Sequence, residues 1–286
     1  QPPHHLPISR DDLAWPTETF DERLVLTVGG EEVHLVHHPA ETDDQCYAWF
    51  PDRRALYSAD YYQGFLPNLG NGKRTQRGTD DWVLAMREMA DLGPLFLFPG
   101  HGEPITDPEL IRSEFHLLAD ALEHIIDHVV DGLNRRLRKD LIVDTLDWPE
   151  RFADHPTLAI RYVTPGDIAR MVIKRWTGWW DDIPSHWSPA PLVDQAATIV
   201  DLAGGLGPLV ARAHSLVDAD VAQACHLADW AWYADPHHPD VQQLVVDAYT
   251  ARVMDPASNT QEILVYLDQA AAARALQLRT AGHPDP

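Results

Sequence analysis

Residues 95–102, LFLFPGHG, decide how the first part of this chain folds. A short apolar run follows the helix-like residues 81–92 and ends at the turn residues 99–102, PGHG. An apolar run of this length after a helix is typical of a buried strand. The stretch therefore predicts a strand whose end carries an imidazole between two glycines.

Two hairpins are predicted upstream of that strand. Residues 22–28 and 31–38 mix apolar and polar side chains and are separated by two glycines. Residues 46–51 and 55–58 repeat this arrangement around a short polar turn. Strand pairs followed by a helix and another strand indicate layered α/β or α+β structure.

The pattern changes to a helical period from about residue 107. Asp107-Pro108 is a typical helix start, and apolar residues recur at helical spacing through residue 136. Further helices are expected at residues 164–181, 191–202, 208–216, 220–234, 239–254 and 260–278. The pair 222–234 and 241–253 is similar to a tetratricopeptide hairpin. We therefore predict an α+β protein with a layered domain at residues 1–106 and an all-helical domain at residues 107–286.

The overall composition limits the function. The 286 residues include 44 Asp and Glu but 22 Lys and Arg, a formal charge of −22. Such a charge argues against nucleic acid as a partner, because phosphate contacts need clustered cations. No apolar run reaches the ~18–20 residues of a membrane span. The first residues lack a signal-peptide pattern, which favours a cytoplasmic location.

Three side chains at expected strand ends are candidate metal ligands: Glu41, Asp60 and His101. Carboxylate oxygens and imidazole nitrogens suit zinc, and loops at strand ends present catalytic groups to solvent. Each residue taken alone also fits a turn, a helix cap or exposed surface. Their occurrence at three strand ends in one β-rich half favours the metal hypothesis.

Four motifs resemble those of a known family. Residues 39–41 (PAE), 58–60 (SAD) and 99–102 (PGHG) match ligand loops, and residues 178–184 (GWWDDIP) match a signature of that family. On these motifs the chain resembles the metallo-β-lactamase-fold alkyl sulfatases that carry a C-terminal alkyl sulfatase dimerisation domain. The resemblance implies half of an αββα sandwich, two zinc ions and a small-molecule sulfate ester as the substrate.

The resemblance also implies a role for each residue. Asp60 would bridge the two zinc ions, Glu41 would complete one site and His101 the other. An arginine of the loop 73–78, Arg74 or Arg77, would hold the sulfate, although a solvated loop fits these residues equally well. Whether the C–O or the S–O bond breaks stays open.

One expected motif is missing from the chain. The family uses a His-x-His-x-Asp-His segment for most of its zinc ligands, and no such segment occurs here. We therefore expect this chain to be the C-terminal portion of the enzyme, active only together with an N-terminal half. That half could belong to the same chain or to a separate one.

Two other functions remain open: a non-catalytic helical dimerisation or binding module, and a lactamase-like or thioester hydrolase on the same scaffold. We also expect a homodimer, formed through an uncovered apolar stripe on the helix at residues 107–136. Trp176, Trp179, Trp180 and Trp187 are interpreted as packing between the domains, with a wall of an alkyl-chain pocket as the alternative.

Overall fold

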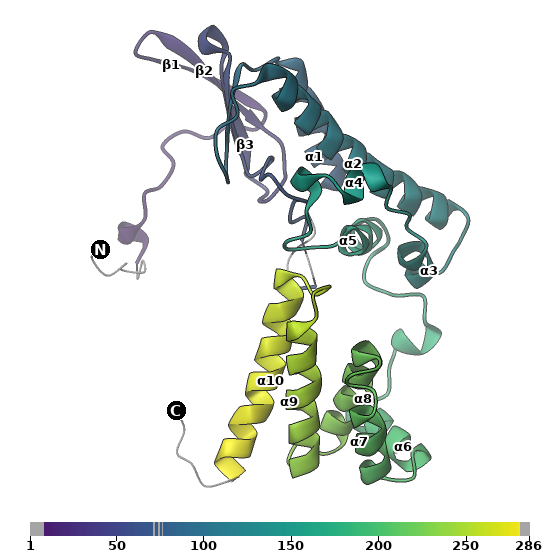
Figure 1. Ribbon diagram of the computed structural model, residues 1–286. Coiled ribbons are helices and arrows are strands. Elements are labelled where there is room, and N and C mark those ends of the chain that lie inside the picture. Colours follow the sequence, from purple (N-terminus) through teal and green to yellow (C-terminus); the bar gives the residue numbers. More distant parts are fainter. Residues whose placement is uncertain (1–8, 71, 74, 76, 281–286) are drawn as a thin grey trace.

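The computed structural model describes residues 9–70, 72–73, 75 and 77–280. Figure 1 shows a sheet and helices α1–α5 in one body and helices α6–α10 in another. Arg74, one of the two arginines expected to hold sulfate, lies outside the described residues.

A five-stranded sheet in the order β1-β2-β3-β4-β5 forms the first layer. Its strands are β1 (Arg23–Val28), β2 (Glu31–His37), β3 (Cys46–Phe50), β4 (Ala55–Ala59) and β5 (Phe96–Pro99). The first four pair antiparallel as two hairpins, and β5 joins β4 in parallel after the crossover helix α1 (Thr79–Asp91). The predicted hairpins, helix and strand are therefore confirmed, but β5 is not a fully buried strand, because only Leu97 is buried and Phe96 is 40% exposed. Together with the helices that follow, they confirm the α+β class.

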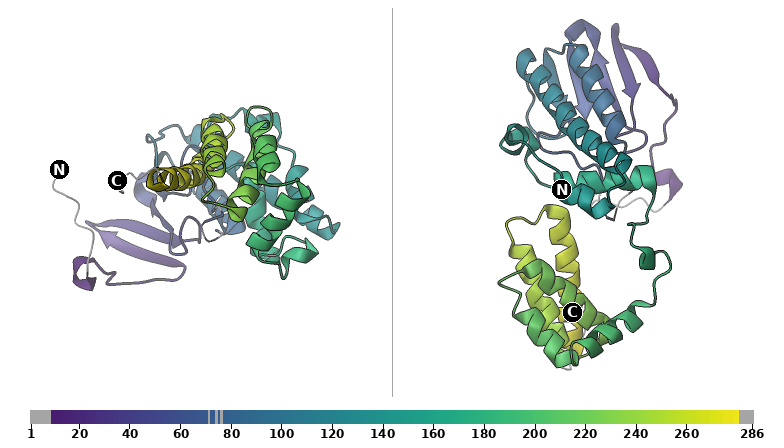
Figure 2. Two further views of the ribbon diagram at one scale, coloured as in Figure 1. Left: turned by 90° about the horizontal axis from the view of Figure 1, so that it is seen from below. Right: turned by 90° about the vertical axis from the view of Figure 1, so that its right-hand side faces the viewer.

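Helix α2 (Pro108–Asn134) covers the sheet together with α1. Asp107 caps it by accepting hydrogen bonds from the amides of Glu109 at 3.0 Å and Leu110 at 3.3 Å. Figure 2 shows the two helices side by side over one face of the sheet. Their facing side chains join one apolar core with the sheet.

The apolar stripe of α2 is not available to a second copy of the chain. Phe115, Leu122, Ile125 and Val129 are completely buried within their own chain. Helices α1, α3 and α5 pack against α2 and cover this stripe. The expectation that an uncovered stripe at residues 107–136 forms the dimer interface is therefore wrong.

Short helices complete the first body. They are α3 (Lys139–Asp144), α4 (Glu150–Ala153) and α5 (Pro165–Thr177). The described chain also has 3₁₀ turns at Arg10–Asp12, Pro51–Arg53, Pro156–Leu158 and Pro184–His186. Two histidines of α2 hold the α3–α4 region in place. Nε2 of His124 donates to the Asp147 carbonyl and Nε2 of His128 donates to the Ile142 carbonyl, each at 2.7 Å.

Five helices form a second apolar core: α6 (Leu192–Leu202), α7 (Leu206–His214), α8 (Val221–Ala234), α9 (Pro239–Met254) and α10 (Thr260–Thr280). The small side chains of Ala228, Ala231 and Ala248 are fully buried where α8 and α9 meet. From residue 107 onward the described chain contains helices and loops and no strand. The domain boundary near residue 107 stays a prediction, since the first core extends across it to Ile173.

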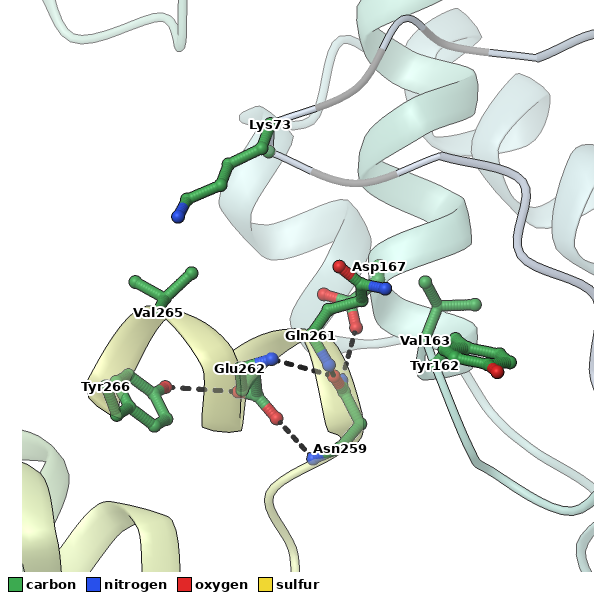
Figure 3. Close-up of a pocket in the computed structure, with 10 residues that line it drawn as sticks. Lys73, Tyr162, Val163, Asp167, Asn259, Gln261, Glu262, Val265 and Tyr266 are labelled. Carbon is green, nitrogen blue, oxygen red and sulfur yellow. Dashed lines mark hydrogen bonds between the residues drawn. The ribbon is translucent and has the colours of Figure 1, made fainter. Parts of the chain in front are cut away.

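A polar joint connects the two cores (Figure 3). The Asn259 side chain donates to Asp167 at 3.2 Å, and the Thr260 amide donates to the Arg161 carbonyl at 2.9 Å. Lys73 pairs with Asp268 of α10 at 3.1 Å. A cavity of about 170 Å³ lies at this joint.

The tryptophans of residues 176–187 do not pack between the cores as expected. Trp176 is 50% exposed, Trp179 is 66% exposed and Trp187 is 63% exposed. The interpretation that these tryptophans are buried between the two domains is therefore wrong, because in a single chain they are exposed to solvent.

Among the described helices, none alone is long and apolar enough to cross a membrane, whereas α6 and α7, bent by 85°, meet those limits as a pair.

Candidate functional site

The ends of β4 and β5 meet tightly. The Gly100 amide donates a hydrogen bond to the Ala59 carbonyl at 2.8 Å. A β-carbon on Gly100 would lie 2.2 Å from Oδ1 of Asp60 and 2.8 Å from the Ala59 backbone. Ala59 itself has a φ of 46°, which a non-glycine residue rarely adopts. Only a glycine fits at position 100, and this close approach brings Asp60 beside the next loop.

Asp60 and His101 face each other across these strand ends. Nε2 of His101 lies 3.3 Å from Oδ1 of Asp60, and both side chains are partly open to solvent. The Phe65 ring lies 6.2 Å from the imidazole and 5.5 Å from the Tyr162 ring. Two of the three predicted ligands are thus brought together, against an aromatic wall that the sequence analysis did not identify.

Glu41 follows β2 and pairs with an arginine. Its Oε1 lies 2.6 Å from the Arg77 guanidinium, and Nε2 of Gln63 donates to Oε2 at 3.3 Å. Burial raises the pKa of Glu41, Arg77 counteracts that rise, and the nearby Asp60 carboxylate adds to it. The predicted sulfate-binding Arg77 and the predicted ligand Glu41 are therefore neighbours.

The loop that carries Glu41 is held by Tyr61, the residue after Asp60. The buried Tyr61 hydroxyl donates to the backbone carbonyls of His38 and, at 3.0 Å, Gln45. The Gln45 side chain in turn accepts from the Glu41 amide at 3.0 Å. Tyr61 thereby fixes the Glu41 loop against the end of β4, a role that its place beside Asp60 could have suggested.

The donor types of the site fit zinc, although the described residues do not complete a ligand set. No three His, Cys, Asp or Glu side chains among the described residues are close enough to hold a metal ion. Near Glu41, however, the buried Oε1 of Gln63 has no hydrogen-bond partner in the described chain. An unsatisfied buried oxygen on a side chain that contacts the Glu41 carboxylate fits a site that receives further groups.

A second cluster of polar side chains, which no sequence motif indicated, lies near the Glu41 loop. Oε2 of Glu88 lies 2.8 Å from Nε2 of His38, and Oε1 accepts from the Tyr47 hydroxyl at 2.7 Å. Burial raises the pKa of Glu88, but the hydrogen bonds from Tyr47 and His38 outweigh it and the pKa is lowered. This cluster joins α1 to the start of the Glu41 loop.

Comparisons with known proteins match this architecture. Residues 139–275 match the family "Alkyl sulfatase dimerisation". A linear primary-alkylsulfatase of Pseudomonas sp. is 28% identical over 223 residues, 77% of this chain and 41% of that protein. An alkyl/aryl-sulfatase of Saccharomyces cerevisiae is 22% identical over 240 residues, 81% of this chain and 36% of that protein.

Solved structures agree on the fold. The stereoselective inverting sec-alkylsulfatase Pisa1 from Pseudomonas sp. superimposes with a TM-score of 0.82 at 20% identity, over 90% of this chain and 41% of that one. The chain thus spans about two fifths of the length of these relatives. The resemblance seen in the sequence motifs is confirmed, and the dimerisation match supports oligomerisation. The chain is therefore a relative of the alkyl sulfatases, with an alkyl sulfatase dimerisation domain at residues 139–275.

Proposed function

We propose that this chain is part of a zinc-dependent hydrolase of alkyl sulfate esters. The proposal rests on the Asp60–His101 pair. Nε2 of His101 lies 3.3 Å from Oδ1 of Asp60, at strand ends that approach closely at Gly100. The relatives named as alkylsulfatases over most of the chain support the substrate class.

The chain's own residues would hold and orient the reacting groups. Glu41, Asp60 and His101 would help to hold two zinc ions. Bound zinc would act as a Lewis acid and lower the pKa of a bound water. The remaining ligands would come from a His-x-His-x-Asp-His segment outside these 286 residues.

Arg77 is the proposed sulfate contact, together with Arg74 of the same loop. Its guanidinium donates to the carbonyl of Asn68 and pairs with Glu41, so it is already held at the site. A planar guanidinium can donate two hydrogen bonds to a tetrahedral oxyanion. Glu41 would then have two roles: it would orient the Arg77 guanidinium toward the sulfate, and it would be a metal ligand.

We further propose that the protein acts as a homodimer. The dimerisation family match supports this, as do the exposed apolar side chains of α6, among which Val193 is 60% and Leu202 is 81% exposed. Sedimentation of the protein at micromolar concentration should give a dimer, and Leu202→Asp should shift it toward the monomer. A monomer for the unaltered protein would contradict the proposal.

Sulfate release from decyl sulfate tests the activity, measured on the protein with any segment that precedes Gln1. We expect turnover that an added zinc chelator abolishes and that zinc restores. Hydrolysis of a lactam or a thioester, without sulfate release, would instead indicate another hydrolase on this scaffold. A protein that dimerises but hydrolyses none of these would be a non-catalytic module.

A further inference from the structure

A pocket of about 410 Å³ opens between α3, α5 and the segment after α5. Its wall is mainly apolar: Met171 and Ile173 come from α5, and Trp179, Trp180 and Ile183 from the segment. Trp179 is 66% and Ile183 is 41% exposed, so large apolar side chains face solvent here. Pockets of this size and lining are typical of small-molecule sites.

Three cations line the same pocket: Lys139, Arg170 and Lys174. Lys139 lies 3.7 Å from Asp182, and Arg170 lies 3.0 Å from Asp167. Lys174 is exposed and forms no ion pair or hydrogen bond with its ammonium group in the part of the chain that the structure describes. One positive charge is therefore available to a ligand.

The two carboxylates of the lining do not cancel that charge, because each has a cationic or imidazole partner. Asp140 accepts two hydrogen bonds from Arg138, at 2.7 and 2.6 Å. Asp181 lies 2.7 Å from Nδ1 of His186. In a chain of net charge −22, an apolar pocket with a free ammonium group is an uncommon local environment.

We propose that this pocket binds an amphiphilic anion, an alkyl chain with one anionic head group. The chain would cover the Trp179 and Ile183 side chains, and the head group would accept from the Lys174 ammonium. None of Glu41, Asp60 and His101 lines the pocket, so this is a second site beyond the proposed hydrolytic one. Only the choice of an alkyl chain over other apolar groups rests on the proposed function.

Decane-1-sulfonate is the probe, because its C–S bond is not an ester and the hydrolytic site cannot cleave it. Titration below its micelle concentration, followed by calorimetry and tryptophan fluorescence, should show one saturable site per chain in this pocket, apart from any binding at the hydrolytic site. Lys174→Gln should weaken this binding about tenfold, the effect of losing one charge-assisted hydrogen bond. The matched variant Arg212→Gln, on α7, should bind as the unaltered protein does.

Two further variants locate the probe. Trp179→Phe should reduce the fluorescence change, whereas Trp15→Phe, near the start of the described chain, should not. Asp60→Asn should bind the sulfonate normally even if it hydrolyses nothing. Loss of binding in Asp60→Asn would place the probe at the hydrolytic site and overturn the second site, while leaving the proposed function standing.

Three other results would also overturn the proposal. The first is binding that appears only with micelles. The second is equal binding of uncharged decyl glucoside with no effect of Lys174→Gln. The third is loss of probe binding at protein concentrations where the chain dimerises, because a second copy would then occupy the pocket.

Discussion

Gly100 lies directly against Asp60, since a β-carbon at position 100 would be 2.2 Å from Oδ1 of the carboxylate. The Gly100 amide also donates to the Ala59 carbonyl, so the ends of β4 and β5 are joined by both packing and hydrogen bonding. The geometry of the candidate site therefore depends on a residue with no functional group.

Gly100→Ala should displace Asp60 and lower the free energy of unfolding by about 1–3 kcal/mol, the usual cost of overpacking. Urea denaturation followed by tryptophan fluorescence measures this. Gly207→Ala is the control, because a β-carbon on this residue of α7 meets nothing within 4 Å. It should leave stability unchanged or raise it by up to ~1 kcal/mol. Equal effects of the two variants would show that position 100 is not crowded.

Arg77→Ala should leave the Glu41 carboxylate partly buried without its cation. The two side chains are 15% and 22% exposed, so we expect a loss of about 3 kcal/mol in the free energy of unfolding. Arg135→Ala breaks an ion pair whose side chains are both 64% exposed and should cost less than ~0.5 kcal/mol. Adding Glu41→Gln to Arg77→Ala should recover part of the loss. No recovery would mean that the pair is not coupled.

Glu88 should contribute to acid sensitivity. Its pKa in the folded protein is lowered from 4.5, so the folded state favours the ionised form. This stabilisation is present above pH 4.5 and is lost as the pH falls through the lowered pKa. Over a third of the side chain is exposed, so solvent screening limits the contribution to about 1 kcal/mol.

Glu88→Gln should therefore reduce stability at neutral pH and flatten its decline below pH 4.5. Urea denaturation at a series of pH values measures both effects. In the control Glu18→Gln, at an exposed loop position, the free energy of unfolding should fall with acid as it does in the unaltered protein. If the free energy of unfolding of Glu88→Gln fell equally steeply with acid, Glu88 would not contribute to the acid sensitivity.

Asn259 should stabilise the joint between the two cores. Its side-chain oxygen accepts from the amides of Gln261 and Glu262 at 2.9 and 3.0 Å, and its amide donates to Asp167. Asn259→Ala removes a helix cap and the bond across the joint, so we expect a loss of about 2 kcal/mol. Gln277→Ala, near the other end of the same helix, breaks a side-chain hydrogen bond to Gln243 of α9 and should have a smaller effect. Limited proteolysis should also cut Asn259→Ala faster between the cores.

Local patterns predicted most of the fold because they act over few residues. The hairpins followed from alternation around Gly29-Gly30, and α2 began at its predicted cap, Asp107. Helices α3 and α4 were missed because they have six and four residues, too short for a helical period to appear. The buried stripe of α2 was misread because a sequence does not show that α5 returns to cover it.

The sequence predicted which residues belong to the candidate site, but it did not predict most of the contacts between them. Asp60 and His101 follow neighbouring strands, and the parallel pairing of β4 and β5 brings them together as expected. The Arg77–Glu41 pair joins residues 36 positions apart in loops, where no periodicity specifies contact. Tyr61 and Glu88 were not identified because aromatic and acidic residues at such positions usually serve packing or solvation.

Zinc content tests directly whether His101 is a metal ligand. In the protein with any segment that precedes Gln1, we expect two zinc ions per chain, and one fewer in His101→Ala. His186→Ala is the control, since this histidine pairs with Asp181 away from the site and should keep both ions. Unchanged zinc in His101→Ala, or a protein that binds no zinc at all, would contradict the account.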